Sequence, residues 1–376
     1  MNLSLGLGLS SFKSLFGGAG DAWTVYKARV VADGGTVYDT GRAKTVYNEV
    51  TAVDTPTLLC TCDAGKAEVL YNIIPAPTGA TYLSEVGGMP TAAYSVDRVV
   101  DGYYDYVMEV RRTVSAVTVE ADVAFDGDTI TLDSAVTITS GSSSATTLGE
   151  FVANASYSDP DSLGSPQDAF VATWYDQAGS NDATQTTAAS QPKIVSAGAL
   201  VTENGKVALD FDGMDWLVTE SAYPTGTNLS HFYVASSTAT NNRVLDTRGT
   251  GAPGDVLGWH HKFSNPSLQD VTLLDDGLGS YLQIGFISRT GQNLVSIFGS
   301  LTSLSEYTNS TLNNSVTGSI NSFDSGNQLY FAANVNGQDT QLFTGKMQEV
   351  VLYTSDKSAL RTAIEGNING RFSIYS

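Results

Sequence analysis

Alternating apolar and polar residues, the period of a half-buried β-strand, recur along most of this chain of 376 residues. Between residues 22 and 74 the alternation runs through several short segments, and the Asp-Gly-Gly sequence at 33–35 is typical of a hairpin turn. The Pro-Ala-Pro run at 75–77 cannot continue a central strand, because proline lacks a ladder donor. The pattern predicts an extended arm at 1–20 and a small β module at 21–80.

Beyond residue 80 the strand pattern continues. Segments 92–98 and 106–112 are expected to pair with each other at the start of a second domain, which extends over 81–376. Segments 117–123 and 129–132 flank an Asp-Gly-Asp turn and predict a hairpin, which a short helix at 148–155 follows. These elements would form a hairpin and loop insertion near 115–165.

The C-terminal half keeps a rhythm of strands and turns. Its apolar segments predict strands at 207–211, 231–235, 281–287, 293–298, 329–333 and 347–353. A helix through Leu360, Ile364 and Ile368 follows a Ser-Asp-Lys-Ser cap. Helices do not alternate with strands, so a parallel doubly wound sheet is excluded. The predicted fold class is all-β with a short C-terminal helix.

Charge and composition narrow the classes of partner. Lys and Arg number 19 against 39 Asp and Glu, a net charge of -20 that disfavours nucleic-acid binding and anionic membranes. The Leu/Gly-rich N-terminus lacks a basic region and a long apolar run, so we expect neither an export signal nor membrane insertion. Cys60 and Cys62 lie two apart on one predicted strand, too close to bridge readily, and are expected to be free thiols.

Four separated stretches carry a resemblance to a known family. They are Gly87-Gly88 with Ala92-Ala93-Tyr94-Ser95, the strand that ends in Arg111-Arg112, the turn Tyr175-Asp176-Gln177, and Asn204-Gly205-Lys206. In order and spacing they resemble the catalytic domain of α-L-arabinofuranosidase B, a concanavalin-like (jelly-roll) β-sandwich, and the phage virion proteins that carry the same sandwich. The resemblance implies this sandwich for residues 81–376.

The family's retaining mechanism needs a nucleophilic carboxylate and a general acid about 5 Å apart. The stretch that resembles the nucleophile's segment, 251–259, offers Asp255 and no Glu, while Asn334 stands where the family has its acid. An amide has no titratable proton to donate. The resemblance therefore implies no catalytic residue. The alternative is a retaining arabinofuranosidase or related glycosidase that uses Asp255 with Asp339 or another displaced carboxylate.

The segments that resemble the family's catalytic segments also supply candidate ligand-binding residues. Trp259 and His260 can stack on a sugar and hydrogen-bond to it, and Asp255, Asn334 and Asp176 are the polar candidates beside them. A fold role in an Asp-initiated turn is the competing interpretation for Asp176. We expect no metal site, because adjacent histidines on a strand face opposite ways and the Asp-x-Asp-Gly sequence at 210–213 lacks the downstream Glu of a calcium loop.

The resemblance implies a bacteriophage virion structural protein, as a head decoration, head fibre or tail appendage. Residues 1–80 would bind other virion proteins, the chain would form a homo-oligomer, and the sandwich would adhere weakly to host-surface glycans. No cofactor is expected. Besides the glycoside hydrolase, a bacterial surface or secreted adhesin is the remaining alternative.

Overall fold

The computed structural model describes two groups of residues. In the first part of the chain these are the backbones of strands at 23–31, 37–39, 57–62 and 66–75. From residue 82 to the C-terminus the structure describes all residues except 224–225, 240–242, 249–252, 254–255, 264–270, 286 and 335–341. The chain divides into two units, one of Met1–Thr81 with Gly102–Asp105 and one of Tyr82–Asp101 with Tyr106–Ser376.

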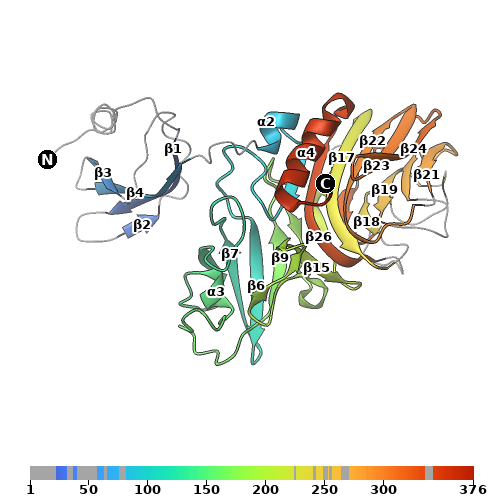
Figure 1. Ribbon diagram of the computed structural model, residues 1–376. Helices are drawn as coiled ribbons and strands as arrows, with labels where there is room; N and C mark the ends of the chain where they lie inside the picture. The colour runs from blue at the N-terminus through green and yellow to red at the C-terminus, as the bar shows by residue number, and fades with distance from the viewer. Residues whose placement is uncertain are drawn as a thin grey trace. The chain divides into compact units, whose positions relative to one another are not determined.

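The first unit contains a four-stranded antiparallel sheet of order β2-β1-β4-β3 (Figure 1). Its strands are β1 (Trp23–Val31), β2 (Val37–Asp39), β3 (Thr57–Cys62) and β4 (Lys66–Pro75). Val31 pairs with Val37 across the predicted 33–35 turn, and β4 ends at the predicted proline run. The expected arm at 1–20 and the thiols of Cys60 and Cys62 lie outside what the structure describes.

The second unit is a β-sandwich whose first layer we call the helix-backed sheet. In this layer β24, β23, β22, β17 and β26 are neighbours in that order, and β5 and β15 both pair with β26. The bounds are β5 (Ala92–Ser95), β15 (Leu209–Asp212), β17 (Asn228–Ser237), β22 (Gly291–Ser300), β23 (Ser303–Thr308), β24 (Thr311–Thr317) and β26 (Thr344–Tyr353).

The second layer, the facing sheet, runs in the order β21-β20-β19-β18-β25-β16-β10-β9-β6-β7-β8. Its strands are β6 (Met108–Val114), β7 (Val117–Val123), β8 (Val136–Ser140), β9 (Ala169–Trp174), β10 (Ala183–Thr184), β16 (Leu217–Ala222), β18 (Arg243–Asp246), β19 (Gly258–Lys262), β20 (Thr272–Asp275), β21 (Tyr281–Ile284) and β25 (Gln328–Phe331).

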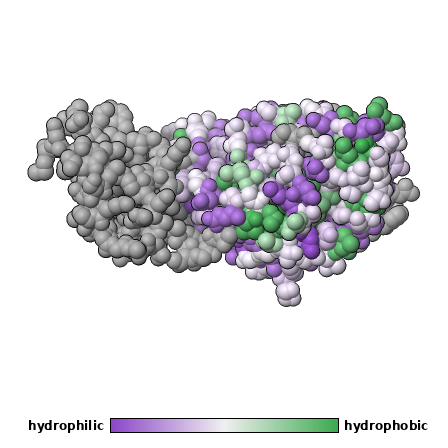
Figure 2. Space-filling model, turned by 90° about the horizontal axis from the view of Figure 1, so that it is seen from above, coloured by the Kyte–Doolittle hydropathy of each residue, from purple (hydrophilic) through white to green (hydrophobic). Residues whose placement is uncertain are grey.

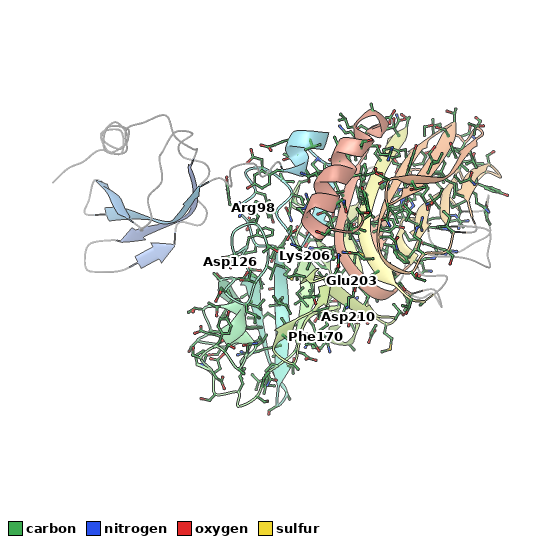
Figure 3. The ribbon with its side chains drawn as sticks, in the orientation of Figure 1. Arg98, Asp126, Phe170, Glu203, Lys206 and Asp210 are labelled. Atoms are coloured by element: carbon green, nitrogen blue, oxygen red, sulfur yellow. The ribbon has the colours of Figure 1, made fainter. Side chains whose placement is uncertain are left out.

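Strand β11 (Lys193–Ser196) links the two sheets. Its Lys193 is the register partner of Phe170 on β9 and of Asp210 on β15, both of which are labelled in Figure 3. Short pieces complete the link, namely β12 (Ala199–Leu200), β13 (Thr202–Glu203), β14 (Lys206–Val207) and the 3₁₀ turn η1 (Ala188–Ser190).

Helices cover one side of the sandwich. The C-terminal helix α4 (Arg361–Phe372) follows the 3₁₀ turn η2 (Ser358–Leu360) and lies against the helix-backed sheet beside α2 (Leu83–Gly87) (Figure 1). Its large apolar residues Ile364, Ile368 and Phe372 are buried, and Arg371 holds the buried Glu349 of β26 through two contacts of 2.6 Å. No helix of the described chain is long and apolar enough to cross a membrane.

Aromatic side chains fill the space between the sheets. Tyr94 of the helix-backed sheet contacts Trp174 and Phe331 of the facing sheet at centroid distances of 6.0 and 4.8 Å. Such offset and edge contacts favour one packing arrangement. These contacts also define the inner face of the facing sheet, so the residues next to them along each strand point to its outer face.

Some predicted elements are wrong. The strands in 92–98 and 106–112 do not pair with each other: β5 pairs with β26, and β6 pairs with β7 and β9. The partner of β7 is β8 instead of 129–132, because the Thr131 hydroxyl binds Asp126 and Ser134 Oγ accepts the Thr131 N–H, which makes this segment a turn. The predicted helix at 148–155 is the shorter α3 (Leu148–Phe151), with Thr147 as its N-cap.

Polar and apolar residues are mixed over the face of the sandwich drawn in Figure 2. The large apolar side chains exposed in the described chain come from separate elements: Met89, Val117, Met214, Leu278, Tyr281, Leu312 and Leu360. Scattered apolar residues of this kind are normal on a protein surface.

Candidate functional site

Strand β19 carries two of the predicted site residues, and all of its residues are buried. Its Trp259 and His261 point to the inner face of the facing sheet. The Trp259 ring lies 4.6 Å from His231 and 5.9 Å from Tyr223, measured between centroids. Trp259 is fully buried in the core, and its predicted role in ligand binding stays a prediction.

His260 points to the outer face, opposite Asp246 of β18 in register. Its Nδ1 lies 3.5 Å from Arg243 Nη1, and Arg243 is paired with the Asp246 carboxylate. The backbone N–H of Arg248 donates to the same carboxylate at 2.5 Å. Two groups thus fix the orientation of Asp246, as a buried carboxylate requires.

A second buried ion pair joins the turn after β18 to the end of β20. Arg248 Nε and Nη2 each lie 3.0 Å from Asp275 Oδ2, and both side chains are almost completely buried. The Gly277 N–H donates to the other oxygen of Asp275. The carboxylates of Asp246 and Asp275 are therefore each held by an arginine.

Asp246 and His260 belong to a line of side chains across the outer face, which we call the outer row. Register places its members side by side on successive strands: Asp122, Glu109, Thr173, Thr184, Val218, Tyr330, Asp246, His260, Leu273 and Gln283. Neighbouring strands lie about 4.8 Å apart, so adjacent members of the row are within contact range. Asp246, His260 and Leu273 are fully buried, whereas the members from Asp122 to Val218 are half-buried.

Trp216 lies beside the middle of the outer row. Its ring stacks on Tyr330 with a centroid distance of 5.7 Å and an interplanar angle of 26°. Trp216 is half-buried, and Tyr330 is 9% exposed. The backbone of Trp216 is fixed by bonds to the Ser190 carbonyl and from the Gln185 side chain, each 3.1 Å long. The site therefore has a rigid aromatic platform.

Polar side chains flank this platform on the strands that follow. Thr173, Thr184 and Glu109 are half-buried, and Thr139 Oγ1 donates to Glu109 at 2.7 Å. The Tyr175 hydroxyl donates to Asp122 at 2.6 Å, and burial together with this carboxylate raises the pKa of Tyr175. Hydroxyls and carboxylates beside an aromatic ring can bind the hydroxyl groups and the apolar face of a sugar.

Asp176 lies elsewhere, in the turn after β9. Its Oδ1 accepts the N–H groups of Ala93 and Ala178 at 2.8 and 3.0 Å, and the side chain is almost completely buried. Burial raises the pKa of Asp176, while these backbone bonds oppose the rise. The carboxylate ties the turn to β5, the fold role that competed with ligand binding.

The remaining predicted residues are placed as follows. Asn334 is buried beyond the end of β25, and Asp255 and Asp339 lie outside the described residues. Within the described part of the chain no cluster of three or more His, Cys, Asp or Glu could hold a metal ion. In the 210–215 turn, Asp212 and Asp215 bind backbone N–H groups, and burial raises the pKa of Asp215 to about 7.

Sequence reasoning missed Trp216, Tyr330, Asp246 and the arginines around His260. Trp216 and Tyr330 meet only because β16 pairs with β25, and no local pattern reports that pairing. A cue existed for Tyr330, since it alternates with the apolar residues of its strand.

Comparison with known proteins identifies the fold. No known family model matches the sequence, and no curated protein does. A solved structure of a GH54 α-L-arabinofuranosidase mutant soaked with 4-nitrophenyl α-L-arabinofuranoside is similar, with a TM-score of 0.52 at 12% identity over 78% of this chain. An arabinofuranosidase complexed with arabinofuranosyl-α-1,2-xylobiose has a TM-score of 0.51 at 13% identity over 78% of the chain.

The chain spans 65% and 64% of those two structures, just under two thirds of their length. At such low identity, similarity supports a shared fold alone. The comparison confirms the predicted all-β sandwich with a short C-terminal helix, which is similar to arabinofuranosidase B-type sandwiches.

Proposed function

We propose that the sandwich is a carbohydrate-binding domain and that it binds an uncharged glycan on the outer row. The observation that carries the proposal is the half-buried Trp216, stacked on Tyr330 and fixed through its backbone. One face of the Trp216 ring is covered by Tyr330, which leaves the other face for a sugar ring. Rigid aromatic side chains bind sugars at a small entropic cost.

Charge favours a neutral ligand. The net charge of -20 and the row's carboxylates Glu109 and Asp122 repel anionic sugars and accept hydrogen bonds from neutral ones. Arabinofuranosyl oligosaccharides are the first probes to use, since a structure with the same fold was solved with one bound.

The arginine pairs favour binding without hydrolysis. A retaining mechanism needs two carboxylates about 5 Å apart, with one of them able to carry a proton. Asp246 and Asp275 are instead each paired with an arginine, which occupies their carboxylate oxygens. We propose that neither of them acts as a general acid.

Tryptophan fluorescence tests the proposed site. Trp174 and Trp259 are fully buried, so a glycan that stacks on Trp216 should change the emission of an accessible indole. Titration of the wild-type chain with arabinan fragments should show a saturable change. Trp216→Ala should weaken binding about tenfold or more, while Trp216→Phe should retain part of it.

The control for this test is Met214→Ala, an exposed neighbour that is not part of the row. It should bind like the wild type. Equal affinity of the Trp216→Ala and wild-type chains would reject the outer row as the binding site.

We also propose a setting for this domain, a virion on which many copies are displayed. The support is the resemblance of the sequence to phage virion proteins, and many copies on one particle would convert weak single-site binding into avidity. Mass spectrometry of purified particles should find the chain at a fixed copy number. Its recovery only from particle-free medium would favour an adhesin.

A further inference from the structure

Two of the chain's three histidines meet in the core between the sheets. His231 of β17 and His261 of β19 are both fully buried, and His231 Nδ1 lies 2.9 Å from His261 Nε2. This hydrogen bond connects the helix-backed sheet directly to the facing sheet. The accepting nitrogen carries no proton, so at least one of the two rings is neutral.

The surroundings of the pair are aromatic. Trp259 stacks on His261 at 4.8 Å, and Tyr223 lies edge-on to His231 at 6.1 Å, both between centroids. Four buried polar atoms of this cluster have no hydrogen-bond partner within the described chain: Tyr223 Oη, His231 Nε2, Trp259 Nε1 and His261 Nδ1. Trp259 Nε1 only donates, so it cannot accept an added imidazole proton, whereas the Tyr223 hydroxyl can.

Charged groups near the pair do not favour a proton on it. Arg289 and Glu306 face the cluster from neighbouring elements and are paired with each other, and Thr272 donates to the same glutamate. Burial and, to a smaller extent, Arg289 lower the pKa of His261 to about 3, while the adjacent His260 backbone opposes them.

Burial also shifts the pKa values of the other histidine and of the neighbouring phenol. Burial, with a smaller effect of His261, lowers the pKa of His231 well below its ordinary value. Burial, with a smaller effect of Asp176, raises the pKa of the Tyr223 phenol.

We propose that the His231–His261 pair is an acid-sensitive lock between the two sheets. Near neutral pH the uncharged pair bonds the sheets together. A proton added to either ring would place a charge in the core, where the carboxylate of Glu306 is already paired with Arg289. Acidification therefore favours separation of the sheets, independently of what the outer row binds.

Acid should destabilise the folded chain, because the pKa values of the two histidines are lower in the folded state than in the unfolded state. An unfolded chain protonates each histidine below a pH of about 6.5, whereas the folded chain does not until far lower pH. The contribution to stability is complete above about pH 7 and is lost as the pH falls below about 6.5. For each imidazole, the folding equilibrium constant falls about 30-fold between pH 7.5 and 5.0.

Urea unfolding of the full chain at pH 7.5 and 5.0 tests the lock. The wild type is compared with the double variant His231→Phe/His261→Phe, which keeps aromatic volume and removes both titrating groups. The difference between the two chains cancels the titration of the carboxylates. Between pH 7.5 and 5.0 the folding equilibrium constant of the wild type should fall by about 30-fold or more beyond that of the double variant. His260→Phe should show the same fall as the wild type. An unchanged pH dependence in the double variant would overturn the proposal.

A second measurement covers the case in which the double variant does not fold. Imidazole ¹⁵N shifts of the folded wild type report each ring directly. Both His231 and His261 should remain neutral at pH 5.0, and titration of both near pH 6.5 would also overturn the proposal.

Discussion

The two faces of strand β19 bury polar groups in opposite ways. On the inner face, His261 is uncharged, contacts His231 and Trp259, and belongs to a cluster of polar atoms without partners. On the outer face, His260 lies next to Arg243, which is paired with Asp246. Neutral groups can occupy an aromatic core, whereas charges are buried only in pairs.

The inner face of β19 contributes to stability, whereas we propose that the outer face contributes to ligand binding. The inner cluster is enclosed by the two sheets, so its chemistry acts on stability. The outer row continues into half-buried polar residues and Trp216, which a ligand can reach. Substitutions on the two faces should therefore affect different properties.

The largest loss of unfolding free energy is expected from substitution of Trp259 on the inner face. Trp259→Ala removes a fully buried ring between the sheets and should lower the free energy of unfolding by about 4 kcal/mol. Urea denaturation measures this loss, and Trp259→Phe should recover much of it. A loss below about 1 kcal/mol would mean that the indole is not packed in the core.

The next effect is expected at the buried Arg248–Asp275 pair. Asp275→Ala leaves the guanidinium without its carboxylate and should cost about 3 kcal/mol of unfolding free energy. The double variant Arg248→Met/Asp275→Leu should be more stable than the single variant. If both variants unfold at the same urea concentration, the ion pair does not explain the cost.

A smaller pH dependence of stability is expected from Asp215. Its sign is opposite to that of the histidine lock. Burial raises the pKa of this carboxyl to about 7, so stability should fall as the pH rises from about 3.8 to about 7. Asp215→Asn should therefore be more stable than the wild type at pH 8, by about 1 kcal/mol, and the gain should vanish near pH 4. Thermal unfolding at the two pH values measures it, and a gain equal at both would contradict the account.

The smallest effect on stability is expected at Trp216. Its ring is half-buried, so Trp216→Ala should change the free energy of unfolding by less than about 1 kcal/mol while it weakens glycan binding. Denaturation and titration of the same preparation compare the two losses. A loss of stability as large as that of Trp259→Ala would place Trp216 in the core instead.

Much of the fold could be predicted from the sequence because long apolar segments dominate it. Strands β17, β22 and β26 have apolar runs that are buried on both faces, and the helix near the C-terminus shows its own spacing. The pairing of strands was harder to predict from the sequence, since β5 pairs with β26 from the opposite end of the domain. Segment 129–132 has strand composition, but side-chain hydrogen bonds hold it as a turn.

The candidate site was less predictable for a physical reason. Every residue of β19 is buried, so alternation shows that Trp259 and His260 face opposite ways but not which of them faces the other sheet. Aromatic composition drew attention to Trp259. Trp216 became the candidate only through the pairing of β16 with β25, which brings Tyr330 to it.

A crystal structure of the full chain with an arabinofuranosyl oligosaccharide tests the central claim most directly. We expect a sugar ring stacked on the face of Trp216 that Tyr330 leaves uncovered, with hydrogen bonds to the half-buried end of the outer row. A sugar bound at any other surface, with Trp216 uncovered, would contradict it.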